Sequence, residues 1–417
     1  MTHYSLLQLA AEALLPSRRG PAFEQSELKS RYDVVIVGGG GHGLATAYYL
    51  AAQHGITNVA VIERGWLGGG NTGRNTTIIR ADYLMPGNVA FFGHALGMWP
   101  TLSRELNFNV MFSPRGYLDL AHSEGQLDHF KRRANVLALN GIGARMADLD
   151  ELRELEPALS IGLEPPIPVL GGLVQDTAGT ARHDAVAWGY ARGARKLGVD
   201  IIQGCEVLGL EIENNHLRAV KTNRGVVRTD TAVVSVAGNS SRVADMAGVK
   251  LPIETYPVQA FVSEPLKPIL HRVTNLNLGY AYAGQTDKGE IVMGGNAEPM
   301  AGYAQRGSPL RIAELTAKLV HIMPFLSRAR LMRVWGGIAD IATDGSAVVG
   351  PSPVAGLHFN AGWGYSGFKA TPAAGWCMAH SLASGKTHPL IEPFGFERFS
   401  SGAFLDEGGA GPYPWLH

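Results

Sequence analysis

One stretch near the N-terminus constrains the fold of this chain more than any other. An apolar run at residues 33–37 leads into a cluster of glycines and then into a helix-forming segment that reaches residue 50. Gly38, Gly40 and Gly43 stand in the spacing G-x-G-x-x-G. The first glycine permits a tight turn, the second lets the backbone approach a phosphate, and the third brings helix onto strand. The pattern predicts a strand, turn and helix that bind a dinucleotide pyrophosphate at the helix N-terminus.

A second apolar strand is predicted at residues 58–62, and it ends at Glu63. An acidic residue about 20 positions after the last glycine accepts hydrogen bonds from the adenosine ribose hydroxyls. The glycine pattern alone would be weak, since a glycine-rich turn can serve only to pack a helix on a strand. Strand, glycines, helix, second strand and acid together favour a dinucleotide site.

Composition excludes several classes of protein. Of 417 residues, 46% are hydrophobic and 17% charged, as in an ordinary globular enzyme, and 36 basic residues balance 36 acidic ones. This balance predicts no nucleic-acid or acidic membrane partner, and no apolar run approaches the roughly 18 residues of a membrane span. Cys205 and Cys377 form no framework of disulfides, so we expect buried thiols and a reducing, cytoplasmic location.

Residues 1–29 are interpreted as an N-terminal arm. The apolar run at 6–15 is short, and Arg18 and Arg19 follow it, which is unlike a signal peptide. An amphipathic helix ending near Pro16 is expected, packed either on the protein's own surface or on a partner subunit.

The rest of the chain returns repeatedly to nucleotide-domain character. The sequence predicts an α/β fold in which a Rossmann-like FAD-binding domain is interleaved with an α+β substrate domain built on an antiparallel sheet. The antiparallel sheet is predicted from the alternation of apolar and polar residues within 252–299. The FAD-binding domain is assigned to residues 30–90, 165–250 and 333–395, and the substrate domain to 91–164 and 251–332. Within the former, strands are expected at 172–175, 200–202, 206–212 and 232–236, with a helix at 184–196.

These returns favour FAD over a nicotinamide cofactor, because the longer ligand needs backbone donors beyond the glycine turn. A helix from about Thr371, behind the glycine-rich residues 362–367, would direct its N–H groups at the flavin ring. The alternative is a glycine loop that only caps a helix. The predicted FAD-binding residues are Gly38, Gly40, Gly43, Glu63, Val207, Gly238, Gly364, Gly367, Phe368 and Lys369.

Several segments resemble a known family. The glycine fingerprint with Glu63 and the segments 76–80, 335–337 and 364–369 are similar to the glycine oxidase and sarcosine oxidase branch of the D-amino acid oxidase flavoproteins. From about residue 31 to 399 the chain resembles the β subunits of heterotetrameric sarcosine oxidases, and the segment 179–184 is characteristic of them.

The resemblance implies oxidation of sarcosine (N-methylglycine) to glycine at a non-covalent FAD. It further implies a second flavin, FMN, bound covalently through a histidine near the large α subunit, with oxygen reduced there to hydrogen peroxide. The methylene group would pass to tetrahydrofolate on the α subunit, giving 5,10-methylenetetrahydrofolate, or leave as formaldehyde. Smaller γ and δ subunits would complete the heterotetramer.

Arg80 and Lys369 are the predicted catalytic residues. The substrate carries a carboxylate, and a planar guanidinium with a compact ammonium suits that group. In monomeric relatives, the arginine and lysine at the matching positions bind the carboxylate. Read without the family, each is a surface or salt-bridged side chain, as charged residues commonly are.

His183 is the predicted attachment point of FMN, with Arg182 beside it. A neutral imidazole nitrogen can attack the methyl carbon of the flavin's electrophilic tautomer, and Arg182 would stabilise the developing negative charge. Many relatives carry lysine where this chain has Arg182. Without the resemblance, His183 would be a capping or surface histidine.

The sequence also indicates how FAD is held and which other functions stay open. Monomeric relatives anchor FAD through a cysteine in the stretch matching residues 335–344, which here contains none, so FAD is expected to be releasable. No metal site, nucleophile elbow or Walker loop is predicted. The alternatives are an FAD-dependent D-amino acid, glycine or opine dehydrogenase without covalent FMN, and a non-catalytic flavin-bearing scaffold.

Overall fold

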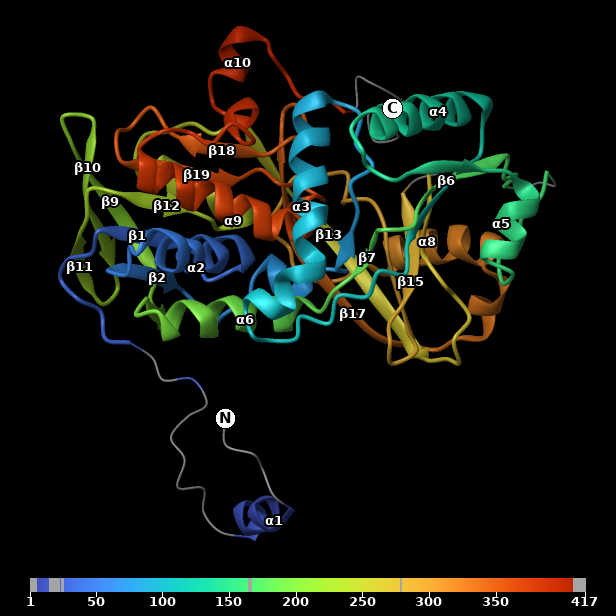
Figure 1. Cartoon of the computed structure of the whole chain (residues 1–417), viewed down its shortest axis with the longest axis horizontal. Helices are drawn as coiled ribbons and strands as arrows, with labels where there is room; N and C mark the ends of the chain where they lie inside the picture. The colour runs from blue at the N-terminus through green and yellow to red at the C-terminus, as the bar shows by residue number, and fades with distance from the viewer. Residues whose placement is uncertain (1–5, 15–22, 24–25, 164–166, 278–279, 408–417) are drawn as a thin grey trace.

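A computed structural model of the chain describes residues 6–14, 23, 26–163, 167–277 and 280–407, arranged around two large sheets (Figure 1). The first sheet has six strands. Its order is β18 (Val348–Pro351), β19 (Leu357–Ala361), β12 (Ala232–Val234), β1 (Val34–Val37), β2 (Val59–Glu63) and β8 (Asp200–Gln203). All neighbours are parallel except β18, which runs antiparallel to β19 at the edge. Such a sheet must be covered on both faces, which explains why every residue of β1 is buried.

Helices cover one face of this sheet. They are α2 (Gly41–His54), α3 (Pro86–Glu105), α6 (His183–Lys196) and α9 (Gly367–Ser384). The helix α2 packs against both α6 and α9, and α3 packs on the outer side of α9. The opposite face is covered by a small antiparallel sheet whose apolar side chains share a core with β1 and β2. That sheet consists of β9 (Val207–Glu213), β10 (His216–Thr222) and β11 (Gly225–Arg228).

The second large sheet has eight strands and lies beside the first (Figure 1). Its order is β17 (Leu331–Ala342), β13 (Ile253–Pro265), β16 (Glu290–Gly294), β15 (Ala281–Gln285), β14 (Val273–Leu276), β4 (Tyr117–Ala121), β6 (Gly171–Gln175) and β5 (Arg145–Ala147). Only the pair β14 and β4 is parallel. Three helices pack against this sheet: α4 (Glu124–Leu139), α5 (Leu149–Leu155) and α8 (Pro309–Ile322).

Short elements complete the fold. The two-stranded ladder of β3 (Ile78–Ile79) and β7 (Gly179–Thr180) brings together segments 100 residues apart in the chain. The others are η1 (Asn71–Arg74), η2 (Ala237–Asn239), α7 (Ser240–Asp245), η3 (Pro324–Arg328), η4 (Glu392–Phe394) and α10 (Arg398–Ser401).

The predicted α/β class with an antiparallel second sheet is confirmed, and several segments lie elsewhere than in the predicted division. The strand at 171–175 and the residues 333–342 of β17 lie in the eight-stranded sheet, not with the nucleotide-binding sheet. Residues 91–105 of α3 pack into the nucleotide-binding core through Trp99 and its neighbours. The helix expected from about Thr371 begins at Gly367. A short apolar segment has the same sequence pattern in either sheet, so only its pairing with distant strands decides which sheet it joins.

The expected N-terminal helix is observed as α1 (Leu6–Leu14). Its side chains Leu6, Leu7 and Leu14 are 84–85% exposed, so these leucines do not pack on the protein's own surface, one of the two expected positions. Pro16 lies outside the described residues. Phe23 packs edge-on against Trp188 of α6. None of the helices in the described ranges has the length and apolar character needed to cross a bilayer.

Candidate functional site

A cavity of about 580 Å³ runs from the glycine turn to the eight-stranded sheet. Its walls come from the turn between β1 and α2, the carboxyl ends of β2 and β12, β17, and the segment that opens α9. In open α/β sheets, ligands bind outside the carboxyl ends of the strands. The second sheet closes the cavity on the other side with residues of β13, β14 and β15.

The glycine turn has the backbone conformation that the fingerprint predicts. Gly38 has a φ of +113° and donates its N–H to the Ile62 carbonyl at 2.8 Å. A Cβ on Gly38 would lie 2.3 Å from the Ser235 carbonyl oxygen, and one on Gly43 would lie 2.1 Å from the Gly38 oxygen. Only glycine fits at either position. The close approach of turn, helix and strand leaves the α2 N-terminus open to the cavity, as a pyrophosphate requires.

Glu63 is held in place by backbone donors. Its Oε2 accepts the Gly39 N–H at 2.9 Å, and its Oε1 accepts the Gly65 N–H at 2.8 Å. These bonds fix the carboxylate at the cavity wall, beside the turn that would carry the pyrophosphate.

Most predicted FAD-binding residues line this single cavity. They are Gly38, Gly40, Glu63, Val207, Gly364, Gly367, Phe368 and Lys369, and the predicted catalytic residue Arg80 joins them. Gly43 and Gly238 do not line it. Gly43 serves helix packing, and a Cβ on Gly238 would lie 2.8 Å from side-chain carbons of Ile338 and Thr255, so that position is small for packing reasons.

Arg80 is part of a buried network of alternating charge. Its guanidinium is paired with Asp82, whose other oxygen lies 3.3 Å from Arg133, and Arg133 lies 3.4 Å from Asp119. Burial opposes ionisation of Asp82, but the charges of Arg80 and Arg133 outweigh it and hold its pKa below the ordinary value. Tyr117 donates to Asp119 at 3.0 Å, and its ring lies under the Arg80 guanidinium. The network fixes the direction of the guanidinium.

Lys369 lies in the first turn of α9 and is only 4% exposed. Its Nζ donates to the Tyr365 carbonyl oxygen at 3.1 Å. Trp99 Nε1 donates to the Lys369 carbonyl oxygen at 3.0 Å, which ties this turn to α3. Burial, and after it the charge of Arg80, hold the pKa of Lys369 well below its ordinary value. Arg80 and Lys369 therefore lie near each other in the wall of the same cavity.

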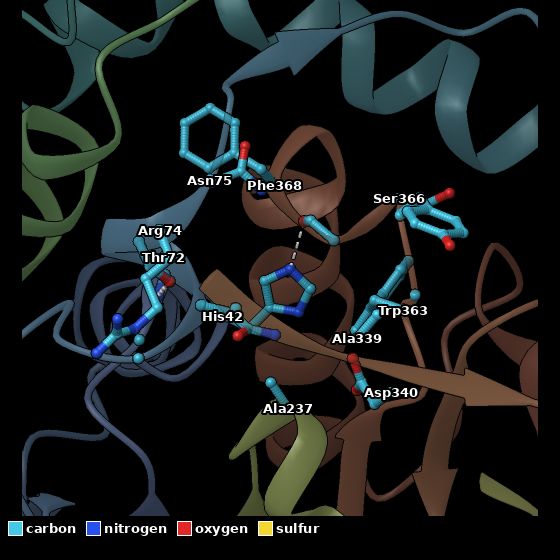
Figure 2. A pocket seen from close by; sticks show the side chains of 18 of the residues that line it. His42, Thr72, Arg74, Asn75, Ala237, Ala339, Asp340, Trp363, Ser366 and Phe368 are labelled. Carbon is cyan, nitrogen blue, oxygen red and sulfur yellow. Dashed lines mark hydrogen bonds between the residues drawn. The ribbon is translucent and has the colours of Figure 1, made fainter. Parts of the chain in front are cut away.

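His42 is a lining residue that the sequence analysis missed. Its Nδ1 lies 3.0 Å from Asn360 Oδ1 and its Nε2 lies 2.6 Å from the Gly367 carbonyl oxygen. Figure 2 shows the imidazole between Thr72 on one side and Trp363 on the other. The ring ties the glycine turn of α2 to the start of α9. A polar aromatic residue inside the glycine motif was the only available signal.

Asp340 was also missed. Its Oδ2 accepts the Gly362 N–H at 2.7 Å, and its carbonyl oxygen accepts the Gly364 N–H at 2.9 Å. Burial raises the pKa of Asp340 to about 6, against the opposing effect of these donors. The residue pins the turn that precedes α9, and no spacing in the sequence pointed to it.

His183 and Arg182 lie away from this cavity. His183 is the first residue of α6, half-buried, and its Nδ1 is buried without a hydrogen-bond partner among the described residues. Burial lowers the pKa of His183; Asp184 opposes that shift and Arg182 adds to it. Arg182 pairs with Asp184 at 2.8 Å on the surface. The imidazole is therefore neutral at pH 7, and the Arg182 charge is partly compensated.

The family described as FAD dependent oxidoreductase matches residues 33–381. The chain belongs to this family. It is 48% identical to the sarcosine oxidase subunit beta of Rhizobium meliloti (strain 1021), over 99% of this chain and all of that protein. It is 44% identical to the sarcosine oxidase subunit beta of Arthrobacter sp, over 95% of this chain and 98% of that protein. The resemblance found in the sequence is thus confirmed, and the chain is an oxidoreductase.

Solved structures show the same fold. The L-proline dehydrogenase from P. horikoshii superposes with a TM-score of 0.84 at 28% identity, over 90% of this chain and 99% of that one. The glycine oxidase from Geobacillus kaustophilus superposes with a TM-score of 0.79 at 21% identity, over 89% and 99% of the two chains. The second likeness supports the architecture alone.

Proposed function

We propose that this chain is the subunit of a heterotetrameric sarcosine oxidase that oxidises sarcosine to glycine. The products would be hydrogen peroxide and either formaldehyde or 5,10-methylenetetrahydrofolate. The observation that carries the proposal is the meeting of Arg80 and Lys369 at the end of the cavity that starts at the glycine turn. Near-half identity to proteins named sarcosine oxidase subunit beta, over the whole chain, supports the choice of substrate.

FAD fits the residues of the cavity. The glycine turn, with no room for a Cβ at Gly38, would hold the pyrophosphate, and Glu63 would hold the adenosine ribose. The opening turn of α9 would direct its N–H groups at the far end of the ligand. When bound, FAD supplies a two-electron acceptor for the amine substrate. No described cysteine lies in residues 335–344, so the cofactor would be held without a covalent bond.

The chain's own residues would bind and orient the substrate. Arg80 would bind its carboxylate with the guanidinium edge that Asp82 leaves free, because a guanidinium has five donors in a planar fork. Lys369, in the first turn of α9, would contact the same carboxylate. Burial of Lys369, which is 4% exposed, strengthens its contact with the carboxylate.

Anaerobic mixing of the FAD-loaded protein with sarcosine tests the proposal. The flavin absorbance should bleach. Arg80→Ala or Lys369→Ala should slow bleaching, because each variant loses roughly 2–5 kcal/mol of interaction with the substrate carboxylate, as truncation of one partner of a charged contact does. Arg218→Ala, which removes an exposed ion pair with Asp230, serves as the control and should bleach like the wild type. Unchanged bleaching in both site variants would place the carboxylate elsewhere.

We further propose that His183 carries FMN covalently and that Arg182 assists the attachment. A half-buried imidazole kept neutral, with a buried Nδ1 that lacks a partner, supports the role of nucleophile. Arg182 also forms a salt bridge with Asp184, so only part of its charge would be available to stabilise the flavin during attachment.

Mass measurement of the denatured chain from the assembled complex tests the attachment. We expect one flavin mononucleotide adduct, absent in His183→Ala, while acid releases FAD. His216→Ala, an exposed histidine, is the matched control and should keep the adduct. An unmodified wild-type mass would favour the alternative, an amino acid dehydrogenase that works with FAD alone.

The proposed assembly includes an α subunit that holds tetrahydrofolate, and γ and δ subunits. Support comes from the relatives, which are named as β subunits. Two buried cysteines that form no disulfide with one another support a cytoplasmic location.

A further inference from the structure

The network behind Arg80 pairs guanidiniums with carboxylates. Two guanidiniums, Arg80 and Arg133, alternate with two carboxylates, Asp82 and Asp119. The side chains of Asp82 and Asp119 are 0% and 3% exposed, and amide groups such as that of Asn275 satisfy the outer oxygens. Arg80 therefore offers a substrate carboxylate its hydrogen-bond donors, while its charge is compensated by Asp82.

Lys369 is the remaining basic group at this end of the cavity. Within the described ranges no carboxylate lies at ion-pair distance from its Nζ, which is bound only to a carbonyl oxygen. The ionisable groups that face this end come from several elements: Arg80, Asp82 and Tyr83 after β3, Tyr117 on β4, and His42 on α2. A buried amine without an anion and beside a guanidinium favours its neutral form.

The substrate proposed above brings both a carboxylate and an ammonium. An amine can be oxidised only after the ammonium proton has left, because the nitrogen lone pair must be free. We infer that Lys369 accepts that proton. One N–H bond of the substrate ammonium breaks, one N–H bond forms at Nζ, and the total charge of the site is unchanged. The new Lys369 ammonium then balances the bound carboxylate. This inference rests on the proposed function.

The substrate itself drives the transfer. Its carboxylate, placed between Arg80 and Lys369, favours the charged form of the lysine. Once protonated, Lys369 in turn disfavours a positive charge on the neighbouring substrate nitrogen. Burial of Lys369 at 4% exposure strengthens both effects, since opposite and like charges interact more strongly out of water.

Methoxyacetate tests the inference, because it has the shape of sarcosine and its carboxylate but no proton to give. Its binding to the FAD-loaded protein is measured by calorimetry at about pH 8 in two buffers with different ionisation enthalpies. The wild type should take up about one proton from solution per ligand bound.

Lys369→Arg is the matched variant, since arginine carries its proton throughout. It should bind methoxyacetate with proton uptake near zero. Binding to the wild type without uptake, or uptake that persists in Lys369→Arg, overturns the inference and leaves the proposed function standing. Absence of any binding to the wild type rejects the carboxylate site itself, and with it both proposals. The wild-type measurement decides the matter even if the variant does not fold.

Discussion

Single residues decide how the proposed carboxylate site is presented, and Asp82 has the largest part in this. Its two oxygens are shared between Arg80 and Arg133, and its side chain is fully buried. Neither guanidinium has Asp82 to itself, so the aspartate holds both at a fixed separation. Arg80 is further confined between the rings of Tyr83 and Tyr117, at 5.5 and 5.1 Å.

Asp82→Asn should therefore damage both stability and binding. Removing this carboxylate charge leaves Arg80 without an ion-pair partner and Arg133 with Asp119 alone, which we expect to lower the free energy of unfolding by about 3 kcal/mol. Methoxyacetate binding should weaken as well, since Arg80 loses its orientation. Asp230→Asn breaks only exposed pairs with Arg31 and Arg218 and should cost less than about 1 kcal/mol. Denaturant unfolding measures both variants; equal losses would contradict the role given to Asp82.

At the scale of elements, the contact between α2 and α9 positions the two ends of the cavity relative to each other. A Cβ on Gly375 of α9 would lie 2.4 Å from the Ala45 Cβ of α2. The helices approach so closely because neither residue has a larger side chain. The N-terminus of α2 faces the pyrophosphate end and the N-terminus of α9 faces the Arg80 end, so one helix contact sets both.

Gly375→Ala should force α2 and α9 apart. We expect a loss of about 1–3 kcal/mol in the free energy of unfolding, as overpacking of a tight core produces, together with weaker FAD binding. Gly97→Ala in α3 is the matched control, because a Cβ there meets no atom within 4 Å. That change should stabilise the helix by about 0.5–1 kcal/mol. Thermal unfolding with and without FAD separates the two; a neutral Gly375→Ala would refute the close-contact argument.

At the scale of the whole molecule, the two large sheets enclose the cavity, and the described residues of the N-terminal segment differ in their contacts. Leu6, Leu7 and Leu14 of α1 are 84–85% exposed, whereas Phe23 packs on Trp188 and its ring centre lies 5.4 Å from the Arg195 guanidinium.

Deletion of residues 1–14 should leave the isolated chain as stable as before, within about 0.5 kcal/mol, because the exposed leucines stabilise no core. Phe23→Ala should cost roughly 1 kcal/mol through its lost aromatic contact. Denaturant titration compares the two. A large loss on deletion would show that α1 packs on its own chain.

The sequence alone determined those features that depend on neighbours along the chain. The turn at Gly38, the first residues of α2 and the acid at Glu63 follow from local steric and hydrogen-bonding requirements, and all three are observed. Resemblance to a family added Arg80 and Lys369, which the cavity brings together.

Tertiary structure decided what depends on contacts between distant segments. The pairing of β6 with β4, and so its sheet, is set by partners 50 residues away, which no local pattern encodes. Gly238, a predicted FAD-binding residue, does not line the cavity, and a Cβ there would lie 2.8 Å from side-chain carbons of Ile338 and Thr255. The Asp82 network joins residues of separate elements, and their mutual burial gives each its role. Local propensity selects strands and turns; burial and charge pairing, which need the whole fold, select the site.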